Sequence, residues 1–157
     1  MSIAAELIRI AREAGQTIAT AESCTGGLVA AAITDIPGSS HVFDRGFVSY
    51  SNDAKQAMLG VRAETLEAHG AVSEETAREM AEGALARSAA CLTVSVTGIA
   101  GPGGSGLKPE GRVCFALAAT GRPTRTQTVE FGPLGRAEVR ARSRDHALEL
   151  LLAALPR

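Results

Sequence analysis

Ser40, Tyr50 and Lys55 are the residues of this sequence whose types could carry out nucleophilic chemistry together. A serine hydroxyl is a weak nucleophile until a base removes its proton, and lysine is a base only when its amine is neutral. If Asn52 caps the helix expected after Tyr50, Lys55 falls in the first turn, where the positive helix end disfavours an ammonium ion. Tyr50 can pass or position a proton. The alternative is a turn serine and a surface lysine, and spacing alone favours this alternative.

Cys24 is a second candidate nucleophile, because it lies between a predicted strand and a predicted helix N-terminus, where a thiolate is stabilised. No histidine lies near it in the sequence to act as its base, and buried cysteines are commonly small hydrophobic core residues. The three histidines, His41, His69 and His146, have no metal-ligand spacing to one another or to the cysteines. We therefore expect no metal site.

The loop from residue 98 to 111 literally satisfies G-x-G-x-x-G at Gly101, Gly103 and Gly106. A proline stands where the helix of a dinucleotide site should begin, and no acidic residue follows at the distance needed to bind a ribose. The loop also lacks the G-K-[ST] ending of a Walker loop. We therefore reject a dinucleotide site, and keep open that the backbone N–H groups of the loop bind an anion.

Alternating strands and helices are predicted to position these loops. Strands are expected at residues 17–21, 43–50, 91–97, 113–119 and 126–131. Helices are expected from Ser2 to Gly15, from Gly26 to Ile36, after Asn52, from Ser73 to Ser88 and from Leu134 to Leu155. Strands alternate with helices early and pair as neighbours late. We therefore predict one α/β domain, residues 1–157, with three α/β/α layers and a mixed sheet flanked by helices.

The composition excludes several classes of protein. The chain of 157 residues has a formal net charge of −1, no Trp and one Tyr, which gives no general attraction to nucleic acid or anionic lipid. No apolar stretch approaches the roughly 20 residues that span a bilayer, and the N-terminus is unlike a signal peptide. Three cysteines without a C-x-x-C pair indicate a reducing compartment. We expect a soluble, cytoplasmic protein without nucleic-acid or membrane partners.

Four long segments resemble, in order, the C-terminal domain of the CinA family: TAESCTGGLVAAAITDIPGSS, FDRGFVSYSNDAKQAMLGV, GAVSEETAREMAEGAL, and VSVTGIAGPGG followed by KPEGRV. The resemblance covers about residues 20–140. Stand-alone members of this family are nicotinamide mononucleotide amidases. The resemblance therefore implies hydrolysis of the carboxamide of nicotinamide mononucleotide to nicotinate mononucleotide and ammonia, in pyridine nucleotide recycling, without a metal or a cofactor.

The resemblance also implies roles for particular residues. It places the serine nucleophile on Ser40, the lysine base on Lys55 and the assisting tyrosine on Tyr50. Substrate-binding positions fall in the early loop, the glycine-rich loop and the last helix: Glu22, Ser23, Thr25, Gly26, Thr97, Gly98, Arg136 and Arg140. One of the two arginines is expected to hold the phosphate. The family often has Gly-Asp-Arg where this chain has Leu-Gly-Arg, so the family's late arginine matches either Arg136 or, one helical turn later, Arg140.

Other functions remain open on the sequence alone. One is a non-catalytic nucleotide- or anion-binding module of the same fold, and another is an amidase that uses Cys24. A partner in DNA uptake or repair has no support from the near-neutral charge. The substrate could be nicotinamide mononucleotide, its riboside or free nicotinamide. We expect a homo-oligomer, with a dimer through the apolar face of the last helix as one arrangement, although core packing explains that face equally well.

Overall fold

A five-stranded mixed sheet organises this protein, whose computed structural model describes residues 1–156. The strands are β1 (Ile18–Glu22), β2 (Phe43–Val48), β3 (Leu92–Gly98), β4 (Arg112–Ala119) and β5 (Arg122–Glu130). The helices are α1 (Ile3–Glu13), α2 (Leu28–Thr34), the short 3-10 helix η1 (Ser39–His41), α3 (Asn52–Leu59), α4 (Ala63–His69), α5 (Glu74–Ala86) and α6 (Arg136–Ala154).

The sheet has the order β2-β1-β3-β4-β5, and both directions of pairing occur in it. β1 pairs in parallel with β2 and β3, with Ala21 opposite both Phe47 and Ser95. β4 and β5 then continue as antiparallel neighbours. β1 is buried along its whole length and β3 along all but its last residue, as expected for strands covered on both faces. The predicted mixed sheet is confirmed.

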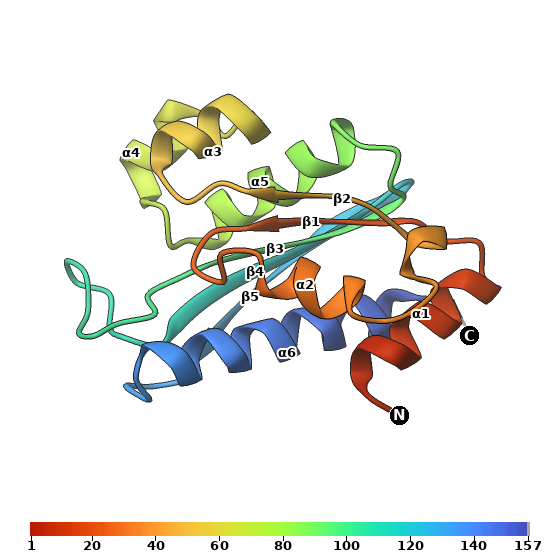
Figure 1. The fold of residues 1–157 in the computed structure, drawn as a ribbon. Coiled ribbons are helices and arrows are strands. Elements are labelled where there is room, and N and C mark those ends of the chain that lie inside the picture. Colours follow the sequence, from red (N-terminus) through yellow and green to blue (C-terminus); the bar gives the residue numbers. More distant parts are fainter. Residues whose placement is uncertain (157) are drawn as a thin grey trace.

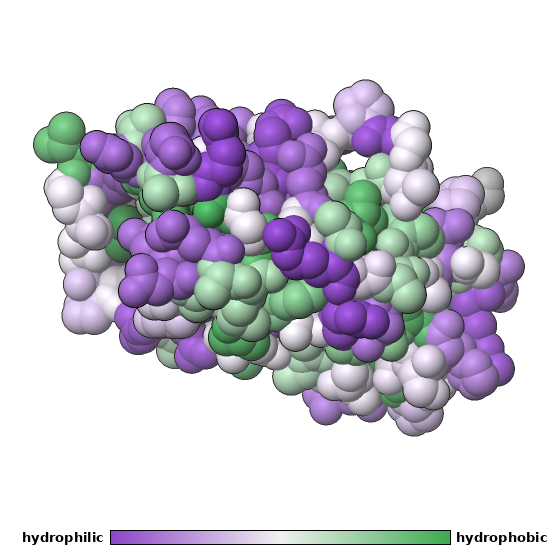
Figure 2. All heavy atoms as spheres, turned by 90° about the horizontal axis from the view of Figure 1, so that it is seen from above, coloured by the Kyte–Doolittle hydropathy of each residue, from purple (hydrophilic) through white to green (hydrophobic). Residues whose placement is uncertain are grey.

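Helices cover both faces of the sheet (Figure 1). α1, α2 and α6 lie on one face, where Leu7, Ile18 and Leu151 belong to the main hydrophobic core. α5 packs on the other face, where Ala77 and Ala81 meet the small side chains of β4, and α3 and α4 lie outside it. Figure 2 shows hydrophilic and hydrophobic residues interspersed over this second side of the molecule. The three predicted layers are therefore present.

The apolar face of α6 is part of the core. Val139, Ala147, Leu148 and Leu151 are buried against the sheet and the neighbouring helices. The alternative explanation of this face, core packing, therefore accounts for it, and a homo-oligomer stays a prediction. Within residues 1–156, no helix is long and apolar enough to cross a membrane.

Serine side chains cap three of the helices. The Ser2 hydroxyl accepts from the N–H of Ala5 at 3.1 Å, and Ser73 caps α5 in the same way, as predicted. The predicted cap at Asn52 is wrong. Ser51 has the extended backbone of a cap and its Oγ accepts from the Ala54 N–H at 3.0 Å, which makes Asn52 the first helical residue. Lys55 is then the fourth residue of α3, at the end of its first turn.

The structure differs from the prediction in two further elements. α4, with seven residues, was not predicted, because so short a helix gives little periodicity. β5 begins at Arg122 rather than at residue 126, and Pro123 lies within it. An edge strand tolerates proline because its outer N–H groups have no strand to pair with. The late strands pair as neighbours, as predicted, and Thr120 and Gly121 form the turn between β4 and β5.

Candidate active site

The amine of Lys55 is buried at the carboxyl end of the parallel strands. The residue is 1% exposed, although lysine is almost always a surface residue. Its Nζ lies 3.0 Å from the Ser23 hydroxyl oxygen, 3.0 Å from the Tyr50 carbonyl oxygen and 3.1 Å from the Ser49 carbonyl oxygen. β1 ends just before Ser23 and β2 ends just before Ser49, so the parallel pairing of these strands brings the three residues together.

This environment favours a neutral amine. Burial lowers the pKa of Lys55 below its ordinary value, and the nearby Cys24 opposes this only in part. A neutral amine has two hydrogens and one lone pair. The carbonyls of Ser49 and Tyr50 can accept the two hydrogens, which turns the lone pair towards the Ser23 hydroxyl. Lys55 is therefore placed to take a proton from Ser23.

Ser23 lies in the turn between β1 and α2. Its N–H donates to the Val96 carbonyl at 2.9 Å, which continues the pairing of β1 with β3 for one more residue. Its hydroxyl lies 3.4 Å from the Tyr50 carbonyl oxygen as well as beside Lys55. A serine between a strand and a helix, held by the sheet and next to a buried base, has the arrangement of an activated nucleophile.

Glu22 holds this turn in place. Its carboxylate is 1% exposed and accepts from the N–H groups of Val29 at 2.9 Å and Ala30 at 3.1 Å, and from the Thr25 hydroxyl at 2.6 Å. A carboxylate at a helix N-terminus is stabilised by the helix dipole and by charge-assisted hydrogen bonds. Glu22 and Thr25 were expected to line the pocket; their side chains instead bind each other and the start of α2.

Ser40 does not lie near Lys55. It is an exposed residue of η1, which enters β2, whereas Lys55 follows the end of that strand. A strand of six residues separates the two by about 20 Å at the usual rise per residue. The predicted pairing of Ser40 with Lys55 is therefore wrong, and the hydroxyl that contacts the amine is that of Ser23.

Tyr50 joins the buried amine to the surface. Its carbonyl contacts Lys55, whereas its side chain is exposed and its hydroxyl accepts from Arg136 Nη2 at 2.8 Å. Arg136, in the first turn of α6, also donates through Nη1 to the Gly101 carbonyl at 2.6 Å. Both acceptors are neutral, so the positive charge of Arg136 remains available to an anion. The Tyr50 hydroxyl is thus directed to Arg136 and away from the expected proton transfer.

Arg140 lies one turn further along α6 and has a different environment. Its Nε donates to the Cys24 carbonyl at 3.1 Å and its Nη2 to the Thr25 carbonyl at 3.2 Å. A Cβ at Gly26 would lie 3.3 Å from the same Nη2, and Gly26 has the left-handed φ of +58° that favours glycine. Arg140 therefore fastens the Ser23 turn to α6, while Arg136 contacts the exposed Tyr50 side chain.

At the end of β3, the Thr97 hydroxyl and the space beside Gly98 are already occupied by other parts of the protein. The Thr97 hydroxyl is buried and donates to the Ala71 carbonyl at 2.8 Å. A Cβ at Gly98 would lie 2.6 Å from the Val113 side chain. The predicted contact of the Thr97 hydroxyl with substrate is therefore not prepared in this structure.

Comparison with known proteins decides the family. Residues 1–155 match the family model described as the CinA C-terminal domain. The chain belongs to this family. The Escherichia coli protein named nicotinamide-nucleotide amidohydrolase PncC is 51% identical over 93% of each chain. A CinA-like protein of Chlorobium phaeobacteroides is 55% identical over 90% of this chain. This chain spans only 26–35% of the length of that protein and of the other long CinA-type relatives.

Solved structures of the CinA family have the same fold. The competence/damage inducible protein CihA from Agrobacterium tumefaciens superposes with a TM-score of 0.91 at 50% identity, covering 98% of this chain and 96% of that one. A CinA superfamily protein from Escherichia coli gives a TM-score of 0.93 at 34% identity, covering 98% and 88%. The family resemblance found in four sequence segments is confirmed over almost the whole chain.

Cys24, next to Ser23 in this CinA domain, is unsuited to be the nucleophile. Burial raises the pKa of its thiol to about 11, so the thiolate is scarce near neutral pH. We expect Cys24→Ala to keep the wild-type turnover and to lower stability by about 1 kcal/mol, as the loss of one buried heavy atom usually does. Ammonia release and a thermal melt measure the two effects. Loss of turnover in a variant that remains folded would point back to the thiol.

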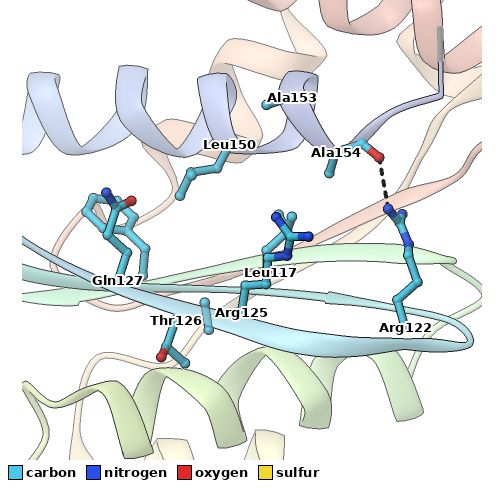
Figure 3. A pocket seen from close by; sticks show the side chains of 10 residues that line it. Leu117, Arg122, Arg125, Thr126, Gln127, Leu150, Ala153 and Ala154 are labelled. Atoms are coloured by element: carbon cyan, nitrogen blue, oxygen red, sulfur yellow. Dashed lines mark hydrogen bonds between the residues drawn. The ribbon is translucent and has the colours of Figure 1, made fainter.

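A cavity of about 440 Å³ in this CinA domain lies between β5 and α6 (Figure 3). Leu117, Leu150 and Ala153 form apolar parts of its lining, and Arg122 donates across its end to the Ala154 carbonyl at 3.2 Å. Neither Ser23 nor Lys55 lines it. In residues 1–156, no cluster of His, Cys, Asp and Glu has the arrangement of a metal site.

Proposed function

We propose that this chain is an amidohydrolase that converts nicotinamide mononucleotide to nicotinate mononucleotide and ammonia, with Ser23 as nucleophile and Lys55 as general base. The observation that carries the proposal is the buried Lys55 amine 3.0 Å from the Ser23 hydroxyl oxygen. The name of the Escherichia coli relative, which matches the chain over 93% of both lengths, supports the substrate. The three free cysteines are consistent with the reducing cytoplasm, where pyridine nucleotides are recycled.

In the first half of the reaction, the neutral amine of Lys55 removes the Ser23 proton as the serine oxygen bonds to the carboxamide carbon. The carbonyl oxygen becomes an oxyanion. We propose that the backbone N–H groups of Cys24 and Thr25 stabilise it, since Glu22 already occupies those of α2. The Lys55 ammonium then gives its proton to the departing nitrogen, the C–N bond breaks, and ammonia leaves an ester on Ser23.

In the second half, water attacks the ester carbon while Lys55 accepts its proton. The bond to Ser23 breaks, and the lysine returns this proton to the serine oxygen, which restores the starting state. The carbonyls of Ser49 and Tyr50 hold the amine in both protonation states, because they can accept from either the amine or the ammonium. Lys55 therefore needs no large movement between the two halves.

Arg136 is the residue we propose for the phosphate. Tyr50 contacts both groups, because its carbonyl accepts from the buried Lys55 amine and its hydroxyl accepts from Arg136. α6 begins at Arg136, so the positive end of the helix dipole lies beside this guanidinium. We expect Arg136→Ala to raise KM for nicotinamide mononucleotide roughly 10- to 100-fold, the value of one lost charge-assisted hydrogen bond, with little change in kcat. Steady-state kinetics measure this. An unchanged KM would remove Arg136 from the phosphate site.

The proposed function is tested by ammonia release from nicotinamide mononucleotide, nicotinamide riboside and nicotinamide. We expect turnover of the mononucleotide and much less of the other two, because they lack the group that Arg136 binds. Calorimetry with the mononucleotide tests the alternative function, in which the chain binds the nucleotide without hydrolysing it. Binding without ammonia release would make the chain a non-catalytic nucleotide-binding module, and would overturn the proposal.

A further inference from the structure

The carboxylate of Glu110 joins the glycine-rich loop to the start of α6. Its Oε1 accepts from the N–H of Gly103, in the glycine-rich loop, at 2.7 Å. Its Oε2 accepts from the N–H of Gly135, the residue directly before α6, at 2.9 Å. Hydrogen bonds to a carboxylate are stronger than those between neutral groups. One side chain thus fixes the distance between the loop and the start of the helix.

Both attachments of Glu110 bear on Arg136. The first is direct, because Gly135 is its neighbour in the chain. The second acts through Gly101, whose carbonyl accepts from Arg136 Nη1 at 2.6 Å. Gly101 is in close contact with Glu110, since a Cβ at Gly101 would lie 2.5 Å from the Glu110 carboxylate carbon. Glu110 therefore locates the backbone that carries Arg136 and also the carbonyl that orients its guanidinium.

Lys108, two residues before Glu110, gives the glycine-rich loop a further anchor. Lys108 Nζ donates to the carbonyl of His69, the last residue of α4, at 2.7 Å and to the carbonyl of Val72, between α4 and α5, at 2.6 Å. The bonds of Glu110 are not needed to attach the loop to the domain. A change at Glu110 is therefore expected to alter the position of Arg136 while the loop stays folded.

We propose that Glu110 is a positioning residue, which holds Arg136 in the place where it binds the phosphate of the substrate. This inference rests on the proposed function. Glu110 sets the selectivity for a phosphorylated substrate over its nucleoside and takes no part in the chemistry at Ser23. A ligand with a phosphate monoester gains from the fixed guanidinium, whereas the riboside has no group that reaches it.

Glu110→Gln tests this inference. The amide has the same shape but only one accepting oxygen, so either Gly103 or Gly135 loses its partner. We expect KM for nicotinamide mononucleotide to rise about ten-fold, with kcat unchanged and the low activity on the riboside unchanged. Glu130→Gln is the matched control, because that exposed carboxylate binds Arg112 at 2.6 Å and touches neither the loop nor Arg136.

A double-mutant cycle separates positioning from a general loss of structure. In an Arg136→Ala background, Glu110→Gln is expected to have no further effect on KM, because the residue it positions is gone. Glu110→Asp, whose shorter side chain cannot reach both N–H groups, should reproduce the rise in KM if the amide variant folds poorly. An unchanged KM, a fall in kcat alone, or additive effects with Arg136→Ala would overturn the inference. Absence of ammonia release by the wild type would instead overturn the proposed function.

Discussion

Ser23→Ala is expected to reduce ammonia release from nicotinamide mononucleotide by roughly 10³-fold or more, the usual effect of removing a covalent nucleophile. The Ser23 hydroxyl lies 3.0 Å from the buried amine. Without it, the amine has no oxygen to activate except that of water. The measurement is kcat from steady-state ammonia release. Because the alanine differs by one oxygen atom, the fold and its melting temperature should change little.

Ser40→Ala is the matched control for this loss. Ser40 is exposed on η1, at the opposite end of β2 from Lys55, so its removal should leave both kcat and KM at the wild-type values. The two variants exchange the same residue types within one chain. Full activity of Ser23→Ala together with loss in Ser40→Ala would reverse the assignment of the nucleophile.

Lys55→Met is expected to lower kcat by about 10²- to 10⁴-fold, which is the range for losing a general base. Methionine fills a similar volume without an amine. The carbonyls of Ser49 and Tyr50 lose a partner, which costs about 1–3 kcal/mol, while the burial of an ionisable group is relieved. The variant should therefore stay folded, as circular dichroism can verify. Wild-type turnover in the folded variant would exclude the lysine as base.

The same lysine sets the expected dependence of activity on pH. Only the neutral amine can accept the Ser23 proton, so kcat/KM should fall as the pH is lowered through the pKa of Lys55. Burial lowers that pKa, so the acid limb should lie below the value of about 10.4 for an exposed lysine. Lys108→Met, at the other lysine of the chain, should leave this limb where it is.

The fold could be predicted from the sequence because its signals are local and agree with one another. Ser2 and Ser73 cap helices as expected, and the run from residue 91 to 97 corresponds to buried β3 within a residue. The alternation of strands and helices was sufficient to predict a mixed sheet in three layers. α4 and the early start of β5 escaped prediction, because a short helix and an edge strand have little hydrophobic pattern.

The site could be predicted in part, and the reason for the failure is topological. The carboxyl ends of parallel strands meet at one edge of a sheet, where ligands usually bind, and the loops after β1, β2 and β3 lie there. That rule places Ser23 and Lys55 together, since each follows a parallel strand. It places Ser40 at the other edge, since η1 precedes β2. The family resemblance points instead to Ser40, which lies at the opposite end of β2 from the buried amine.

The sequence alone could not show which groups Glu22, Arg136 and Arg140 contact. Their types and approximate places were visible, but a carboxylate can line a pocket or cap a helix, and two arginines one turn apart can exchange roles. The distances separate them: Glu22 binds the start of α2, Arg140 binds the Ser23 turn, and Arg136 faces Tyr50. Pairings between segments distant in sequence depend on register, which no local pattern specifies.

The most direct test of the central claim, that Lys55 activates Ser23, is to locate the acyl group during turnover. Wild-type protein mixed with nicotinamide mononucleotide is quenched in acid, digested with trypsin and analysed by mass spectrometry. Cleavage after Arg12 and Arg45 leaves Ser23, Cys24 and Ser40 in one peptide, so fragmentation must localise the adduct. We predict a nicotinate mononucleotide ester on Ser23, absent from Lys55→Met. An adduct on Cys24 or Ser40, or an undiminished adduct in Lys55→Met, would contradict this account.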